Sequence, residues 1–293
     1  MQLSQVLVFA FVEGKDMDPY FFGQICAAVC NQRQISYQIC RADEILSNSG
    51  GKEALLVFYD FLRKQTGLNS NPWGKKTIAI FFLDKDIDDI TRRRRRSRHV
   101  IYTRYYDVQN EIFLNGDLCQ GCASAASLDP VRLASLLSDS HTWCKHAAQR
   151  WQDWVVLCII AKIKSIRQVC NYRVHSKVQN PITGEVDAPR LEARVKEMAV
   201  RSGMALADFE ALLESVKRKV RRYYSSGQQD KVFKGKWYSA LLDEDINRLM
   251  GQSAFSRHGL STSVNSAVGA TLRFSDSWAQ YYVSRLADLI DAP

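Results

Sequence analysis

The chain has 293 residues, 46% hydrophobic and 24% charged, which allows one large domain or two modest ones and excludes a disordered chain. Its formal net charge of +9 favours polyanionic partners, although scattered surface lysines can carry the same charge. No stretch of about 18 residues is apolar enough to span a bilayer, and the N-terminus lacks the pattern of a signal peptide. We therefore expect a cytoplasmic protein whose eight cysteines are reduced.

The first part of the chain alternates apolar runs with amphipathic segments. Amphipathic helices are expected at Asp18–Gln32 and Lys52–Thr66. Strands are expected at Val6–Val12, Ile35–Ile39, Thr77–Leu83 and His99–Thr103. Continuous apolar runs are typical of strands buried on both faces, and their alternation with helices predicts a mostly parallel sheet flanked by helices.

After about residue 118 the pattern becomes mainly helical. Helices are expected at Leu128–Ser138, Thr142–Lys164, Ala188–Gly203, Ala205–Ser225, Ser239–Met250 and Arg273–Ile290. The sequence thus predicts an α/β domain over residues 1–118 and a mainly helical domain over residues 119–293. We expect the helical domain to serve dimerisation, partner docking or substrate binding.

Acidic residues follow two of the expected strands. Glu13 comes after the first, and Asp84 and Asp86 come after the third. Sites in open α/β sheets form at the carboxyl ends of the strands, so these side chains converge if the strands are neighbours. Carboxylate oxygens suit Mg²⁺. Asp88 is a further candidate ligand, although Asp88 and Asp89 can equally be turn formers or helix N-caps.

Several motifs resemble a known family. Val12-Glu13-Gly14-Lys15 with Asp84-Lys85-Asp86 is similar to the Toprim signature. Three more segments fit the same group: Gly50-Gly51-Lys52-Glu53-Ala54, Thr103-x-Tyr105-Tyr106-Asp107-Val108-Gln109-Asn110 and Phe233-Lys234-Gly235-Lys236. Together they resemble the Toprim nuclease subunits of PARIS-type anti-phage systems, the AriB-like effectors, which are related to OLD-family nucleases.

The resemblance implies a Toprim-like (Rossmann-like) fold and a toxic nuclease. Such effectors are held by an ABC-type ATPase, dimerise when released, and cut host RNA, with transfer RNA the expected target and DNA the other option. Glu13 would be the essential acidic group, and Asp84 and Asp86 would bind Mg²⁺, or Mn²⁺ in its place. Independently of the resemblance, Lys15 is a candidate for a catalytic phosphate contact because it lies close to Glu13 in the sequence.

One position departs from the family pattern. Related nucleases often carry Glu-Asn where this chain has Gln109-Asn110, so either Asp107 or Glu111 takes over that role or the position does not touch the metal. This puts a second metal in doubt. Alternatives to the nuclease are a primase or topoisomerase activity on the same fold, and a non-catalytic module that binds an ATPase or nucleic acid. No phosphate-binding loop of the GxxxxGK[ST] type occurs, so ATP hydrolysis would belong to a partner.

A run of arginines follows the third strand. Arg92, Arg93, Arg94, Arg95, Arg96 and Arg98 suit the phosphate backbone of a substrate. An acidic protein partner or a solvated loop are the alternatives. Lys234 and Lys236 are weaker candidates for phosphate contacts. Tyr102, Tyr105 and Tyr106 could stack unpaired bases, although such residues more often pack a strand and its turn.

Four residues have the spacing of a structural zinc site. Cys119-x-x-Cys122 is followed by His141-x-x-Cys144, which is compatible with tetrahedral Zn²⁺. In the alternative, Cys122 and Cys144 are core residues and His141 belongs to a helix N-terminus. The family resemblance implies no zinc.

Overall fold

The computed structural model describes residues 6–45, 51–91, 93–137, 139–171, 178–180, 184–250 and 260–292. The chain forms two compact units, neither of which is one continuous segment. The sheet unit comprises Met1–Lys85, Arg93–Arg104 and Leu272–Pro293. The helical unit comprises Asp86–Arg92 and Tyr105–Thr271. The sequence alone suggested a single boundary at residue 118, whereas the last residues of the chain belong with the sheet.

A parallel sheet forms the centre of the first unit, as the apolar runs predicted. Its four parallel strands lie in the order β2-β1-β4-β5, and the short β3 pairs antiparallel with the beginning of β4. The strands are β1 (Val6–Val12), β2 (Ser36–Arg41), β3 (Asn69–Ser70), β4 (Lys76–Leu83) and β5 (Val100–Tyr102). Because β1 and β4 are direct neighbours, the residues directly after each of them meet at one edge of the sheet.

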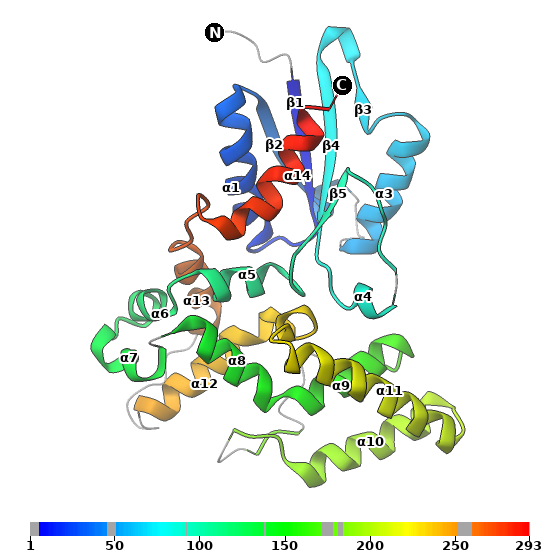
Figure 1. The fold of residues 1–293 in the computed structure, drawn as a ribbon, viewed down its shortest axis with the longest axis vertical. Coiled ribbons are helices and arrows are strands. Elements are labelled where there is room, and N and C mark those ends of the chain that lie inside the picture. The colour runs from blue at the N-terminus through cyan, green and yellow to red at the C-terminus, as the bar shows by residue number, and fades with distance from the viewer. Residues whose placement is uncertain are drawn as a thin grey trace. The chain divides into compact units, whose positions relative to one another are not determined.

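Helices cover both faces of this sheet, which explains why β1 is apolar throughout and β4 is apolar from Ile78 onward. On one face lie α1 (Asp18–Cys30) and, beside it, α14 (Gln280–Ile290) from the end of the chain (Figure 1). There Phe22 stacks on Phe82 with ring centroids 4.3 Å apart. On the other face α3 (Lys52–Lys64) packs Leu55 and Tyr59 into a buried cluster with the strands. The short α2 (Ala42–Ile45) follows β2.

The helical unit holds the remaining helices. They are α4 (Asp88–Thr91), α5 (Val108–Asn115), α6 (Leu118–Ala126), α7 (Pro130–Leu137), α8 (Ser140–Arg150), α9 (Gln152–Ile163), α10 (Ala188–Ser202), α11 (Leu206–Ser225), α12 (Tyr238–Met250) and α13 (Leu260–Gly269). The mainly helical second half is therefore as expected. None of the helices in the described ranges is both long enough and apolar enough to cross a membrane.

One expected helix is wrong in its extent. The pattern over Thr142–Lys164 predicted a single helix, but the chain makes two, α8 and α9, with a break at Trp151. Trp151 leaves helical geometry at φ −108° and ψ 11°, and its side chain is fully buried, 6.0 Å from the ring of Trp237. The apolar pattern continues across the break because α8 buries one stripe and α9 is buried on all sides from Trp154 to Ala161. The C-terminal helix is also shorter than expected, since Ser277–Ala279 is a 3-10 turn.

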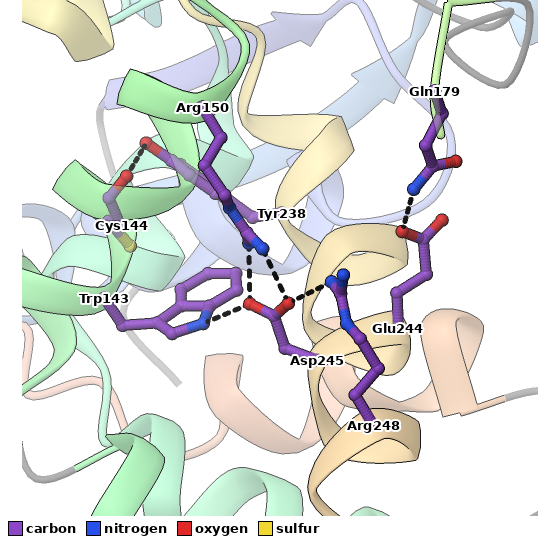
Figure 2. Close-up of polar contacts among 8 residues, drawn as sticks. All are labelled: Trp143, Cys144, Arg150, Gln179, Tyr238, Glu244, Asp245 and Arg248. Atoms are coloured by element: carbon purple, nitrogen blue, oxygen red, sulfur yellow. Dashed lines mark hydrogen bonds and ion pairs between the residues drawn. The ribbon is translucent and has the colours of Figure 1, made fainter. Parts of the chain in front are cut away.

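A cluster of polar side chains joins α8 to α12 in the helical unit (Figure 2). Asp245 accepts a hydrogen bond from Trp143 Nε1 at 3.0 Å and two from the guanidinium of Arg150 at 2.9 and 2.7 Å. Arg248, one turn further along α12, donates to the same carboxylate. Because the Asp245 side chain is only 10% exposed, these donors replace the water it loses on folding.

Candidate active site

Two of the expected acidic residues meet at the edge of the sheet. Val12 is paired with Phe82, so β1 and β4 end side by side and Glu13 and Asp84 follow directly. The backbone N–H of Asp84 donates to Glu13 Oε2 at 3.3 Å. Asp84 is 7% exposed and Glu13 is half-buried. The carboxylate of one motif thus lies against the backbone of the other at the carboxyl ends of parallel strands.

A third acidic residue, Asp18, shapes the turn that carries Glu13. Its carboxylate accepts the backbone N–H of Gly14 at 2.7 Å, and its side chain is buried. A Cβ atom at position 14 would lie 2.8 Å from this carboxylate, so any other residue there would displace Asp18 from the turn. The sequence offered Asp18 only as the beginning of a helix; its role at the turn depends on the fold.

Two lysines hold the tip of β4 through its backbone. Lys52, in the first turn of α3, donates from Nζ to the carbonyl of Asp84 at 2.7 Å. Lys85 is fully buried and donates to the carbonyl of Arg104 at 2.7 Å, while its own N–H donates to Thr103 Oγ1 at 2.8 Å. These charge-assisted bonds fix the backbone at Asp84. Sequence motifs singled out Lys52 and Thr103, but gave them no role.

Lys15 is exposed just beyond the Glu13-Gly14 turn, on the same unit. Its place suits contact with a molecule that approaches Glu13 from solvent. The role expected from the sequence stays a prediction.

The arginine run lies on the sheet unit before β5, apart from Arg92, which is outside the described residues. Arg93, Arg94, Arg95, Arg96 and Arg98 are all exposed. Arg95 pairs with Asp60 at 2.5 Å, and Arg94 lies 5.5 Å from the centroid of the Tyr102 ring. The Tyr102 hydroxyl accepts the N–H of Arg95 at 2.8 Å. The run is therefore partly ordered by α3 and β5, with several guanidinium groups directed to solvent.

Two of the three tyrosines are not available for base stacking. Tyr102 and Tyr106 are 6% and 2% exposed, so for these two the packing alternative is correct. The Tyr102 ring has Lys52 Nζ 5.4 Å from its centroid in addition to Arg94. Tyr105 is half-buried.

Asp86 and Asp88 belong to the helical unit. Asp86 adopts the left-handed backbone conformation at φ +54°, and its carboxylate pairs with Lys162 at 3.1 Å. Its N–H donates to the carbonyl of Tyr106 at 2.8 Å. Asp88 is buried and, with Asp89, forms the first turn of α4, as the helix-start alternative proposed. The structure gives Asp86 a cationic partner of its own, and it does not add either residue to a cluster with the strand tips.

The two remaining family motifs pack together inside the helical unit. Asp107 caps α5 by accepting the N–H of Asn110 at 3.3 Å, and it also accepts the N–H of Lys236 at 3.3 Å. Asn110 accepts from Gly235 N and donates to the carbonyl of Phe233. A Cβ atom at Gly235 would lie 2.3 Å from the backbone nitrogen of Asn110, which requires glycine.

Burial raises the pKa of Asp107 to about 6, although Lys236 and Lys234 lower it. Lys236 is exposed and Lys234 is half-buried, and both act electrostatically on this carboxyl group. Asp230, which accepts hydrogen bonds from Tyr238 and Asn110, is also buried, and burial raises its pKa. The sequence could not show that the two motifs form one polar core.

Gln109, the position that departs from the family pattern, is buried in α5, and its Oε1 makes no hydrogen bond within the described part of the chain. Of the two residues considered as its substitute, Asp107 is the helix cap and Glu111 accepts from Asn115 Nδ2 at 3.2 Å. Both carboxylates therefore make hydrogen bonds within α5.

The four residues of the zinc prediction are not brought together. Cys119 donates to the carbonyl of Pro130 and Cys144 to that of Phe113, whereas Cys122 is buried in α6. His141 lies in the first turn of α8, where its N–H is capped by Asp139. Across the described ranges, no three His, Cys, Asp or Glu side chains form a group that could hold a metal. Glu13 and Asp84 are likewise not part of a group of three such side chains; they are two residues joined by the bond from Asp84 N to Glu13 Oε2.

Comparison with known proteins found no matching family model, no matching curated protein and no matching solved structure. The assignment of a function to this chain therefore rests on its own geometry.

Proposed function

We propose that the chain is a magnesium-dependent nuclease that hydrolyses phosphodiester bonds, with Glu13 and Asp84 at the centre of its active site. The observation that carries the proposal is the hydrogen bond from Asp84 N to Glu13 Oε2, between residues 71 positions apart. It joins the Glu-Gly turn and the Asp-x-Asp motif at the carboxyl ends of neighbouring parallel strands, where α/β sheets form their sites.

The donor set fits Mg²⁺, since this ion commonly binds through one or two carboxylates and completes its shell with water and substrate phosphate. Glu13 and Asp84 would hold it, and Asp86 is a third candidate by sequence that would first have to leave Lys162. Bound Mg²⁺ would neutralise charge on the phosphodiester and make water a better nucleophile. In the overall reaction, water adds OH to phosphorus, and the leaving oxygen takes the remaining proton.

The surrounding residues have supporting tasks. Lys52 and Lys85 keep the backbone at Asp84 in place, and Asp18 keeps the turn at Glu13 in place. The exposed arginines and Lys15 supply positive charge for the phosphate backbone on the same unit. A buried, rigid support for the two carboxylates is what electrostatic catalysis needs, because the groups do not reorganise during the reaction.

The family resemblance extends the proposal. The sheet unit would be a Toprim-like domain, a finer assignment that its 2-1-4-5 parallel order and strand-tip carboxylates support. The protein would be an effector of phage defence in the cytoplasm, held by an ABC-type ATPase, dimeric when active, and directed at host RNA, with transfer RNA favoured.

The test is cleavage of total cellular RNA and of plasmid DNA by the purified chain with Mg²⁺. Glu13→Gln and Asp84→Asn remove one charge each with little change in shape. Glu210→Gln, an exposed glutamate on α11, is the matched control. We expect discrete RNA fragments from the wild type and the control, and none from the two strand-tip variants. Calorimetric titration with Mn²⁺ gives a readout besides activity, and both variants should weaken its binding.

A different outcome would redirect the assignment. The nuclease proposal fails if two results are found together. Neither nucleic acid is cut, even with the candidate ATPase present, and Mn²⁺ binds the variants as tightly as the wild type. The non-catalytic binding module then becomes the better description.

A further inference from the structure

The second half of α11 is strongly basic, in a unit that does not contain Glu13 or Asp84. Four exposed residues, which we call the basic face, lie within five positions: Arg218, Lys219, Arg221 and Arg222. The opposite stripe of the helix is buried; it includes Val216, Val220 and Tyr224. The apolar stripe packs α11 against α9, and it thereby directs the basic face to solvent.

Two of these charges act on a nearby carboxylate without pairing with it: Arg221 and Arg218 help to lower the pKa of the exposed Glu214. Lys217, next to the basic face, pairs with Glu214 at 2.9 Å. For the four residues of the basic face, no ion pair with a carboxylate occurs in the part of the chain that the structure describes. Basic residues near a helix C-terminus also stabilise the helix dipole, but this effect reaches only the last turn. It accounts for Arg222 and leaves Lys219 unexplained.

The basic face borders a cavity of about 350 Å³ within the helical unit. From α11 and the residue that caps its end, the cavity is lined at the spacing of one helix face by Lys219, Arg222, Tyr223 and Ser226. Gln228 adds an amide, and Asp89 and Ile90 come from α4. Two cations with neighbouring hydroxyl and amide groups form a concave polar surface suited to an anion, and Asp89 is the one acidic residue among these lining residues.

We propose that the basic face of α11 and this cavity bind the phosphodiester backbone of a nucleic acid. Several closely spaced cations on one helix favour a repeating polyanion over a single small anion, because each phosphate that is neutralised releases counterions. Arg222 can offer a planar fork to a phosphate, and Lys219 a point charge. RNA and DNA share this chemistry. The site is distinct from the arginine run, which belongs to the other unit, and its binding does not require that the acidic pair be catalytic.

The experiment measures binding of a fluorescent RNA hairpin, and of a DNA hairpin of the same sequence, by anisotropy over a series of salt concentrations. All variants are made in the full chain with Glu13→Gln, so that cleavage cannot interfere. The test variant is Lys219→Gln with Arg222→Gln. The control is Lys64→Gln with Arg132→Gln, which removes the same two charge types from exposed positions on α3 and α7.

We expect the test variant to bind on the order of tenfold more weakly than the control, with a salt slope lower by about 1–2, since two phosphate contacts are lost. Asp89→Asn should tighten binding, because it removes the negative charge that faces the incoming phosphate. A larger effect on the RNA hairpin than on the DNA hairpin would assign RNA as the ligand; the reverse would assign DNA.

Equal affinities and salt slopes for the test and control variants would overturn the inference. So would a chain that binds polyglutamate at this face and neither hairpin, which would make it a surface for an acidic protein. Thermal unfolding of each variant checks that the exposed substitutions leave the fold intact. Failure here leaves cleavage by the wild type unaffected, whereas failure of the nuclease proposal leaves hairpin binding unaffected, so the two are separable.

Discussion

Two carboxylates, one in each unit, have opposite surroundings. In the helical unit, Asp245 is met by the indole N–H of Trp143 and by the guanidinium groups of Arg150 and Arg248 (Figure 2). In the sheet unit, Glu13 is placed against the backbone of a second acidic residue, Asp84, and the nearby Lys52 and Lys85 donate to carbonyl oxygens.

This difference indicates that Asp245 stabilises the fold, whereas Glu13 is available for a function. A buried carboxylate that is surrounded by donors holds elements together, and its removal leaves the donors unsatisfied. A partly exposed carboxylate at the carboxyl ends of parallel strands, as Glu13 is, suits a cation that arrives from solution. The comparison leads to opposite expectations for substitutions in the two units.

The largest effect is expected at Glu13. Glu13→Gln should lower the rate of phosphodiester cleavage by on the order of 10²–10³-fold, because a group that stabilises developing charge is lost. Its free energy of unfolding should stay nearly the same, since the glutamine oxygen can still accept the N–H of Asp84. Single-turnover cleavage and urea denaturation measure the two quantities. If the loss in free energy of unfolding accounted for the whole loss in cleavage rate, Glu13 would be a structural residue like Asp245.

Asp245 should show the reverse. Asp245→Ala is expected to lower the free energy of unfolding by about 3 kcal/mol, because it leaves Arg150 and Trp143 largely buried without their acceptor. Cleavage per folded molecule should not change. Urea denaturation gives the stability, and Asp245→Asn, which keeps an oxygen for Trp143, should lie between the wild type and alanine. A loss below about 0.5 kcal/mol would fit an exposed ion pair and contradict this role.

The stability of the helical unit should depend on pH through Asp107. This residue is a buried carboxyl group, and burial raises its pKa to about 6. A raised folded-state pKa means that the native protein holds the proton more tightly than the unfolded chain. The stability from this group is therefore full below about pH 4, near its unfolded pKa, and is lost as pH rises through about 6.

The measurement is the unfolding free energy of the wild type and of Asp107→Asn between pH 4 and 7. The difference between them should change by about 2–3 kcal/mol across this range, in the direction that disfavours the wild type at higher pH. Parallel profiles would show that Asp107 titrates at its ordinary pKa and that its burial has no electrostatic cost.

The smallest effect is expected at Lys52, which supports the site without lying in it. Lys52→Met should cost about 1.5–2 kcal/mol in the free energy of unfolding, the low end for hydrogen bonds from a charged group, because Lys52 is half-buried and bonds mainly to the Asp84 carbonyl. Lys64→Met, exposed on the same helix, is the control and should be close to neutral. Cleavage should fall by less than in Glu13→Gln. A larger loss of cleavage than at Glu13 would place Lys52 in contact with the substrate.

Local pattern by itself determined the parallel sheet, the mainly helical second half, and the position of Glu13 and Asp84 at strand ends. It could do so because two-sided burial demands continuous apolar strands, and because the residue after a strand lies at the edge of the sheet by geometry. Helix limits were less well predicted, since periodicity records which face is buried and not where the axis turns, as at Trp151.

Only the tertiary structure decided which distant residues act together. In the fold, Asp18 accepts a hydrogen bond from the turn after Glu13, and Lys52 donates to the carbonyl of Asp84. The N–H of Gly235 donates to Asn110. The tertiary structure also assigned Asp86 to Lys162 and directed the basic face of α11 to solvent. The physical reason is that hydrogen bonds and ion pairs depend on distances between atoms far apart in the chain, which only the packing of helices and strands sets.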